Sequence, residues 1–97
     1  MQIVKIYLYN IFFEIGNLVS FRDKVMAIEA FQKKLGKQIA ALRKKSGLSQ
    51  TALAHKIDKD RQWLNYIEKG KGNPTVKTLY LIAAELGVDV KHFFELE

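Results

Sequence analysis

The stretch from Gln50 to Lys69 (QTALAHKIDKDRQWLNYIEK) contains two short runs of helical periodicity separated by a tight turn. Leu53 and Ile57 lie on one helical face in the first run, and Leu64 and Ile67 lie on one face in the second. Apolar residues at such intervals of three or four positions share one side of a helix. The four side chains can therefore meet in one core if two short helices cross steeply.

The residues between the two runs suit such a crossing. Ala54 lies where the two helices would approach most closely, and a larger side chain there would push them apart. Asp58 occupies a turn position that usually needs a positive φ, which Gly adopts easily and Asp tolerates better than most residues. Ser49 and Asp60 precede the two runs and are suitable N-cap residues. We expect helices at about 50–57 and at about 60–69.

Similar signals continue on both sides of this stretch. A first helix is expected from about Ala27 to Lys45, followed by Gly47 as a left-handed cap. Thr75 is expected to cap a fourth helix that ends at Gly87, and Asp89 a short fifth one. The predicted fold is therefore an all-α, compact five-helix domain with short connections. Its inward-facing residues should include Leu35, Ile39, Leu42, Leu53, Ile57, Leu64, Ile67, Leu79, Ile82, Ala83, Leu86, Val90 and Phe93.

Residues 1–26 differ from the rest and are expected to form an N-terminal apolar extension to a domain of residues 27–97. Only Lys5 and Glu14 are charged before Arg22. The β-branched and aromatic composition is compatible with a strand or hairpin arm. A helix is the alternative, because Leu8, Ile11, Phe12 and Ile15 fall on one helical face.

Two further readings of this extension are less favoured. A membrane anchor or signal segment fits poorly, because Lys5 and Glu14 interrupt the apolar stretch and no small-residue cleavage site follows. Met26 is a second candidate for the natural start of the chain. We expect an arm that contacts a partner or covers the core, with a poorly ordered extension as the alternative.

The helix expected at about 60–69 has a polar outer face if its apolar residues turn inward. This face presents Arg61, Gln62, Asn65, Tyr66 and Lys69. Arg pairs bidentately with guanine, and Gln and Asn pair with adenine, in the major groove of DNA, which admits an α-helix. Between residues 35 and 94 there are eleven Lys or Arg and five Asp or Glu, a net charge of +6. The whole chain also has a net charge of +6. The positive charge therefore lies on the predicted domain, as expected for a polyanionic partner.

Residues 35–94 resemble the lambda-repressor-like family of helix-turn-helix domains, in the branch of small phage repressors and restriction–modification controller proteins. The matching pieces are LGKQIAALRKKSGLSQTALA, IEKGKGNPT and TLYLIAAELGV followed by DVKHFF. The resemblance implies a sequence-specific transcriptional regulator, by default a repressor, that reads double-stranded DNA as a homodimer. Lys59, where the family usually has an apolar residue, Asp58 in place of Gly, and residues 1–26 depart from the family pattern.

The resemblance also implies roles for individual residues. The base contacts are expected from Arg61, Gln62, Asn65 and Tyr66. The phosphate contacts are expected from Gln50, Thr51, Lys59, Lys69, Lys71 and Asn73. Arg43 and Glu68 match a pair that forms a partly buried salt bridge in related repressors.

Other functions have weaker support. An antitoxin-type protein-interaction module that uses residues 1–26, with secondary DNA binding, is the alternative function. We expect no enzyme, because no nucleophile–base arrangement or phosphate-binding Gly loop is present. We also expect no metal, cofactor, small-molecule substrate or membrane association. The chain has no Cys, which excludes a thiolate metal site and is compatible with a cytoplasmic protein.

Overall fold

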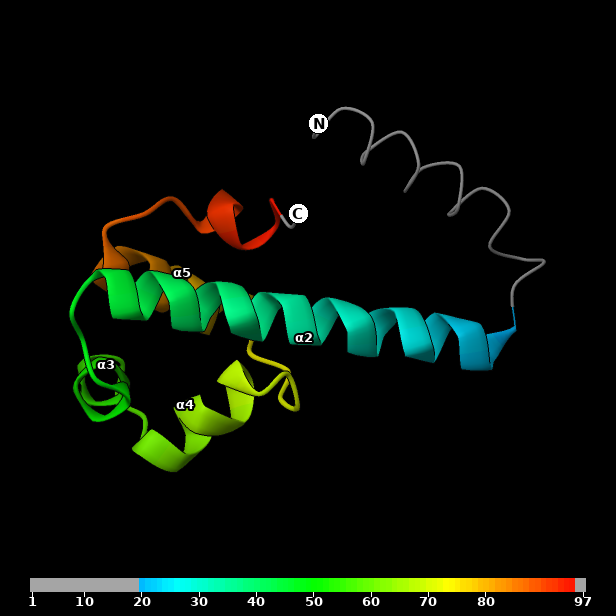
Figure 1. Cartoon of the computed structure of the whole chain (residues 1–97), viewed down its shortest axis with the longest axis horizontal. Coiled ribbons are helices and arrows are strands. Elements are labelled where there is room, and N and C mark those ends of the chain that lie inside the picture. Colours follow the sequence, from blue (N-terminus) through cyan, green and yellow to red (C-terminus); the bar gives the residue numbers. More distant parts are fainter. Residues whose placement is uncertain (1–19, 96–97) are drawn as a thin grey trace.

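A long helix, α2 (Phe21–Lys45), spans the molecule, and the other elements pack against its C-terminal half (Figure 1). The computed structural model describes residues 20–95. After α2 come α3 (Gln50–Lys56), α4 (Arg61–Glu68), α5 (Val76–Leu86) and the 3₁₀-helix η2 (Val90–Phe93). The described residues contain no strand. The predicted all-α class is confirmed, and the last of the expected five helices is a 3₁₀ turn.

The helix starts are set by side chains that accept a hydrogen bond from the first turn. Ser49 Oγ accepts from the Ala52 N–H at 3.0 Å, and Asp60 Oδ1 accepts from the Trp63 N–H at 2.7 Å. Such caps satisfy backbone donors that have no partner inside the helix. All four predicted caps are confirmed, namely Ser49, Asp60, Thr75 and Asp89.

The expected start of the first helix at about Ala27 is wrong, because α2 begins six residues earlier, at Phe21. Ser20 has extended backbone geometry, and its Oγ accepts from the Asp23 N–H at 3.1 Å. Asp23 also places a negative charge in the first turn, where the helix dipole favours it. Part of the predicted extension is therefore helical, and residues 1–19 lie outside the described part of the chain.

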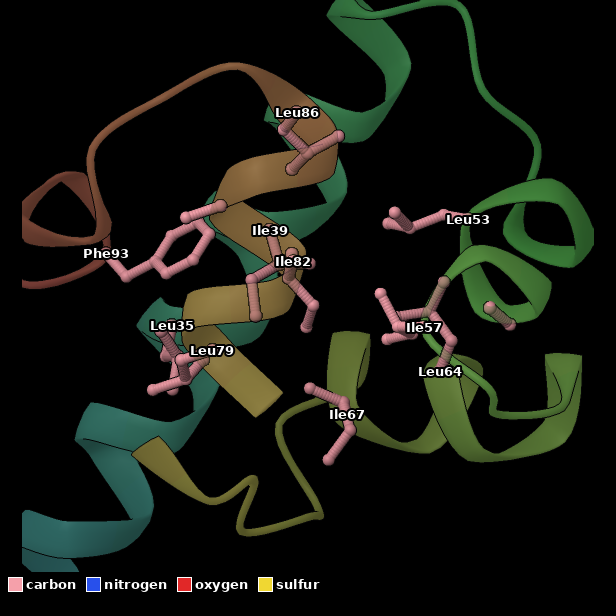
Figure 2. Close-up of a cluster of buried hydrophobic side chains, with 12 residues drawn as sticks. Leu35, Ile39, Leu53, Ile57, Leu64, Ile67, Leu79, Ile82, Leu86 and Phe93 are labelled. Carbon is pink, nitrogen blue, oxygen red and sulfur yellow. The ribbon is translucent and has the colours of Figure 1, made fainter. Parts of the chain in front are cut away.

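The buried apolar residues form one cluster between α2, α3, α4, α5 and η2 (Figure 2). Burying side chains of this size is the main favourable contribution to folding, and truncating one to Ala typically costs about 2–5 kcal/mol. Leu42 and Val90 are only partly buried and pack against the cluster. The predicted core is otherwise confirmed, with members Leu35, Ile39, Leu53, Ala54, Ile57, Leu64, Ile67, Leu79, Ile82, Ala83, Leu86 and Phe93.

A glycine allows α2 to approach the end of α4 very closely. A Cβ atom added at Gly36 would lie 2.5 Å from the Ile67 carbonyl oxygen and 2.6 Å from that of Glu68. Both neighbours are backbone atoms, so a side chain at Gly36 would force the two helices apart. Gly70, with φ of 77°, permits a similarly close approach of the loop after α4 to Lys33. These two positions fix α4 against α2.

Candidate nucleic-acid interface

The turn between α3 and α4 adopts the geometry that its residues predict. Asp58 has a φ of 59° and is the only non-glycine residue with a positive φ among residues 20–95. The Lys59 N–H donates to the Ala54 carbonyl at 2.8 Å and so satisfies an acceptor at the end of α3. Ala54 is fully buried at this crossing. The expected left-handed turn and the close approach at Ala54 are both confirmed.

The turn orients α4 so that its apolar side faces the core and its polar side faces outward. Leu64 and Ile67 are buried, whereas Arg61, Gln62 and Tyr66 are exposed. Asn65 is half-buried, and Lys69 is exposed just beyond the helix end. The four residues predicted to read bases therefore lie on the outward side of one short helix, with Asn65 at its inner edge.

A buried ion pair joins α2 to α4 behind this surface. Arg43 Nε donates to Glu68 Oε2 at 2.7 Å, and Arg43 Nη2 donates to Glu68 Oε1 at 3.1 Å. The Arg43 and Glu68 side chains are only 10% and 6% exposed. Arg43 Nη1 also donates to the Leu48 carbonyl at 2.8 Å. The predicted Arg43–Glu68 salt bridge is thus present as a bidentate pair, a geometry that fixes orientation as well as distance.

Gln50 extends this network to Asn65 on α4. Its Nε2 donates to Glu68 Oε1 at 2.9 Å and to Asn65 Oδ1 at 3.2 Å. Both N–H groups of the Gln50 amide are therefore used inside the protein. With Oδ1 of Asn65 engaged, its NH₂ group is left to donate outward. The resemblance implied only a phosphate contact for Gln50. The hydrogen bond between Gln50 and Asn65 was not predicted, because a link across 15 positions leaves no local signal.

The other predicted phosphate-binding residues are exposed around α4. Thr51 lies in the first turn of α3, and Lys59 lies in the turn with its Nζ 5.2 Å from the centre of the Trp63 ring. Lys71 and Asn73 lie on the loop after α4, which folds back because the Lys71 N–H donates to the Tyr66 carbonyl at 3.2 Å. The exposed cations of this region therefore lie at both ends of α4.

Two kinds of site have no candidate in the described part of the chain. Residues 20–95 contain no cluster of three His, Asp or Glu side chains that could bind a metal ion. None of the helices described between residues 20 and 95 has the length and apolar character needed to cross a membrane.

Comparison with known proteins gives consistent matches to this part of the chain. A family model described as helix-turn-helix matches residues 39–93. An uncharacterized HTH-type transcriptional regulator of Sinorhizobium fredii is 40% identical over 57 residues, which are 59% of this chain and 74% of that protein. The immunity repressor protein of Bacillus phage phi105 is 39% identical over 56 residues, which are 58% of this chain but only 39% of the repressor.

The structural comparison agrees. The crystal structure of the restriction-modification controller protein C.AhdI from Aeromonas hydrophila has a TM-score of 0.65 and 29% sequence identity to this chain. The match covers 68% of this chain and 96% of the controller protein. The similarity therefore includes nearly the whole of a small regulatory protein.

Proposed function

The chain belongs to the helix-turn-helix family, and from that premise we propose that it is a transcriptional regulator that binds duplex DNA and represses transcription. The observation that carries this proposal is the polar outer side of α4, which is left exposed because Leu64 and Ile67 turn into the core. An α-helix of this kind fits the major groove of B-DNA, where base edges are distinguishable. The protein would act in the cytoplasm, where its DNA target lies.

The proposed base contacts come from Arg61, Gln62, Asn65 and Tyr66. Arg61 lies at the N-terminal end of α4, the end that points at the bases in related docking geometries. Because Gln50 holds Oδ1 of Asn65, the Asn65 NH₂ group is oriented to donate, for instance to N7 of a purine. We therefore assign Gln50 to positioning Asn65, in place of the direct phosphate contact expected from the sequence.

The proposed phosphate contacts come from the exposed residues around α4, namely Thr51, Lys59, Lys69, Lys71 and Asn73. Such contacts set the register of the protein on DNA without reading its sequence. Asn65 and Asn73 therefore form a matched pair for an experiment, since both are amides but only Asn65 lies on α4.

The experiment selects bound sequences from a random DNA pool and measures affinity for the selected site. We expect Asn65→Ala to cost about 1–3 kcal/mol on the selected site and to relax the preference at one base pair. Asn73→Ala should weaken binding to all sequences about equally. Arg61→Ala should relax the preference at a second position. Unchanged sequence preference in both Asn65→Ala and Arg61→Ala would contradict the assignment of α4 as the reading helix.

We propose that the protein acts as a homodimer that pairs through α5. Val76 and Tyr80, one helical turn apart on α5, are 74% and 64% exposed, and Leu81 next to them is also exposed. Two copies can read half-sites one DNA turn apart, which a single domain cannot do. Tyr80→Glu should shift the sedimentation coefficient to that of a monomer, whereas Lys44→Glu, at an exposed position near the end of α2, should change it less. A monomeric wild-type protein at micromolar concentration would contradict this mode.

A further inference from the structure

The loop after α4 lies directly on α2 at Lys33. A Cβ atom added at Gly70 would lie 2.5 Å from the Lys33 Cα and 2.8 Å from its Cγ. Gly70 is buried and has a φ of 77°, so this approach suits a residue without a side chain. Lys69 and Lys71, which flank Gly70, are exposed, and so is Lys33. The contact therefore brings three exposed lysines from two elements together.

Lys37 extends this group along α2. It is exposed and follows Lys33 by about one helical turn, or about 6 Å, on the same side of the helix. Gly36, next to Lys37, approaches the Ile67 carbonyl oxygen, so this side of α2 faces the end of α4. These exposed side chains form a basic cluster, namely Lys33, Lys37, Lys69 and Lys71.

The basic cluster forms no ion pair within the described part of the chain. The ion pairs found between residues 20 and 95 are Arg43–Glu68 and Lys56–Glu85, and neither includes a member of the cluster. Glu68, which precedes Lys69, is thus already engaged by Arg43. Like charges on neighbouring positions repel one another, and a bound anion would relieve this repulsion.

The basic cluster continues the outward side of α4. The Lys71 N–H donates to the Tyr66 carbonyl at 3.2 Å, and a Cβ atom added at Gly72 would lie 3.2 Å from Cδ2 of the Tyr66 ring. The loop therefore runs from Tyr66 on α4 to Lys33 on α2. Figure 1 shows this loop (yellow) on the same side of α2 as α3 and α4, whereas η2 (red) lies on the opposite side. A duplex seated on α4 would thus lie beside the cluster.

We propose that the basic cluster binds a further stretch of the DNA phosphate backbone, with Lys33 and Lys37 of α2 as contacts beside those of the loop. A lysine ammonium binds phosphate as a point charge. Both α2 lysines lie before residue 39, where the match to the family model begins, so these contacts add to those of the matched domain. They strengthen binding to any sequence and leave the base preference unchanged. The inference rests on the proposed function, because it needs a duplex on α4.

Lys34 provides a matched control on the same helix. It is exposed and follows Lys33 in the sequence, but it lies about 100° further around the helix. Gln38, one turn after Lys34, donates to the His92 carbonyl at 3.3 Å, so this side of α2 faces η2. Lys33→Gln and Lys34→Gln therefore remove the same charge from two different sides of α2.

The salt dependence of DNA affinity tests the contact, with the full-length protein and a site selected from a random pool. Lys33→Gln should reduce the log–log slope by about 0.9, so that a fourfold rise in salt weakens its binding about 3.5-fold less than that of the wild type. Lys33→Arg and Lys34→Gln should both keep the wild-type slope. A wild-type slope in Lys33→Gln, or equal reductions in Lys33→Gln and Lys34→Gln, would overturn the inference and leave the proposed function intact. A wild-type protein that binds no duplex would overturn both.

Ethylation of single phosphates in the selected site locates the contact, because an ethyl group removes the charge of the phosphate that carries it. At least one phosphate should be found whose ethylation weakens binding of the wild type and of Lys34→Gln but not of Lys33→Gln. This phosphate should lie next to one that has lost its effect in Lys71→Gln, since the loop and α2 are in contact at Gly70. If every sensitive phosphate is shared by the wild type and Lys33→Gln, then Lys33 touches no phosphate and the proposal is wrong.

Discussion

Replacing Arg43 by Met should destabilise the protein strongly, because it leaves a buried carboxylate without its main partner. Met keeps most of the apolar stem but removes both hydrogen bonds to Glu68, at 2.7 and 3.1 Å, and the bond to the Leu48 carbonyl at 2.8 Å. The Glu68 side chain is only 6% exposed, so water cannot replace those donors fully. Among residues 20–95, the donor that would remain to Glu68 is Gln50 Nε2, at 2.9 Å from Oε1.

The size of the loss follows from this burial. Removing one partner of a buried ion pair costs about 3–5 kcal/mol, whereas domains of this size are stable by only about 5–15 kcal/mol in total. For a domain of 60–100 residues, each kcal/mol lowers the melting temperature by about 4–8 °C. Arg43→Met should therefore lower the melting temperature by more than about 10 °C.

Urea unfolding followed by circular dichroism measures this loss, and a double variant separates its causes. In Arg43→Met/Glu68→Leu no unpaired charge remains, and replacing buried pairs by apolar residues is often neutral or stabilising. The double variant should therefore recover most of the stability lost in Arg43→Met. A single variant that loses less than about 1 kcal/mol, or a double variant no more stable than the single one, would refute the assignment of the cost to the buried Glu68 charge.

Three further outcomes are expected. Gly36→Ala should lower the free energy of unfolding by about 1–3 kcal/mol, the cost of overpacking, because its Cβ would meet the backbone of Ile67. A loss below about 0.5 kcal/mol would show that α4 can move aside. Asp58→Val should destabilise by about 1–2 kcal/mol in urea unfolding because φ is 59°, whereas Asp58→Gly should not; equal effects would contradict strain at this turn. The affinity for DNA, measured by fluorescence anisotropy, should fall as salt rises with a log–log slope of about −0.9 for each phosphate contact; a flat response would exclude the proposed cationic contacts.

The features that could be predicted from the sequence are those whose cause is local. Ser49 and Asp60 cap helices because a short polar side chain reaches the N–H three residues on, and this depends on nothing distant. Asp58 has a positive φ for the same kind of reason. The inward face of α4 follows from helical spacing alone, which also fixes its outward residues.

The start of α2 and the role of Gly36 could not be predicted in this way. The apolar and aromatic residues that precede Ala27 are compatible with a strand, a helix and a membrane segment, so they do not indicate where the helix begins. The local signal of its start is Ser20 followed by Asp23. Gly36 within a helix has no helical advantage. A glycine is needed at position 36 because the backbone at the end of α4 lies too close for a Cβ atom, and that backbone is more than 30 positions away in the chain.

The network behind α4 links the stability of the fold to the chemistry of the surface proposed to read bases. Arg43 holds Glu68, Glu68 accepts from Gln50, and Gln50 fixes the amide of Asn65, so that a residue of α2 affects the orientation of a donor on α4. Gln50→Glu is the sharpest probe of this link. A carboxylate at position 50 could no longer donate to Asn65 or Glu68 and would repel the latter, so Asn65 would be free to turn its oxygen outward. The base preferred opposite Asn65 should then change in a random-pool selection, although residue 50 itself touches no base. An unchanged preference in a folded Gln50→Glu protein would show that Asn65 is oriented by DNA and not by the network.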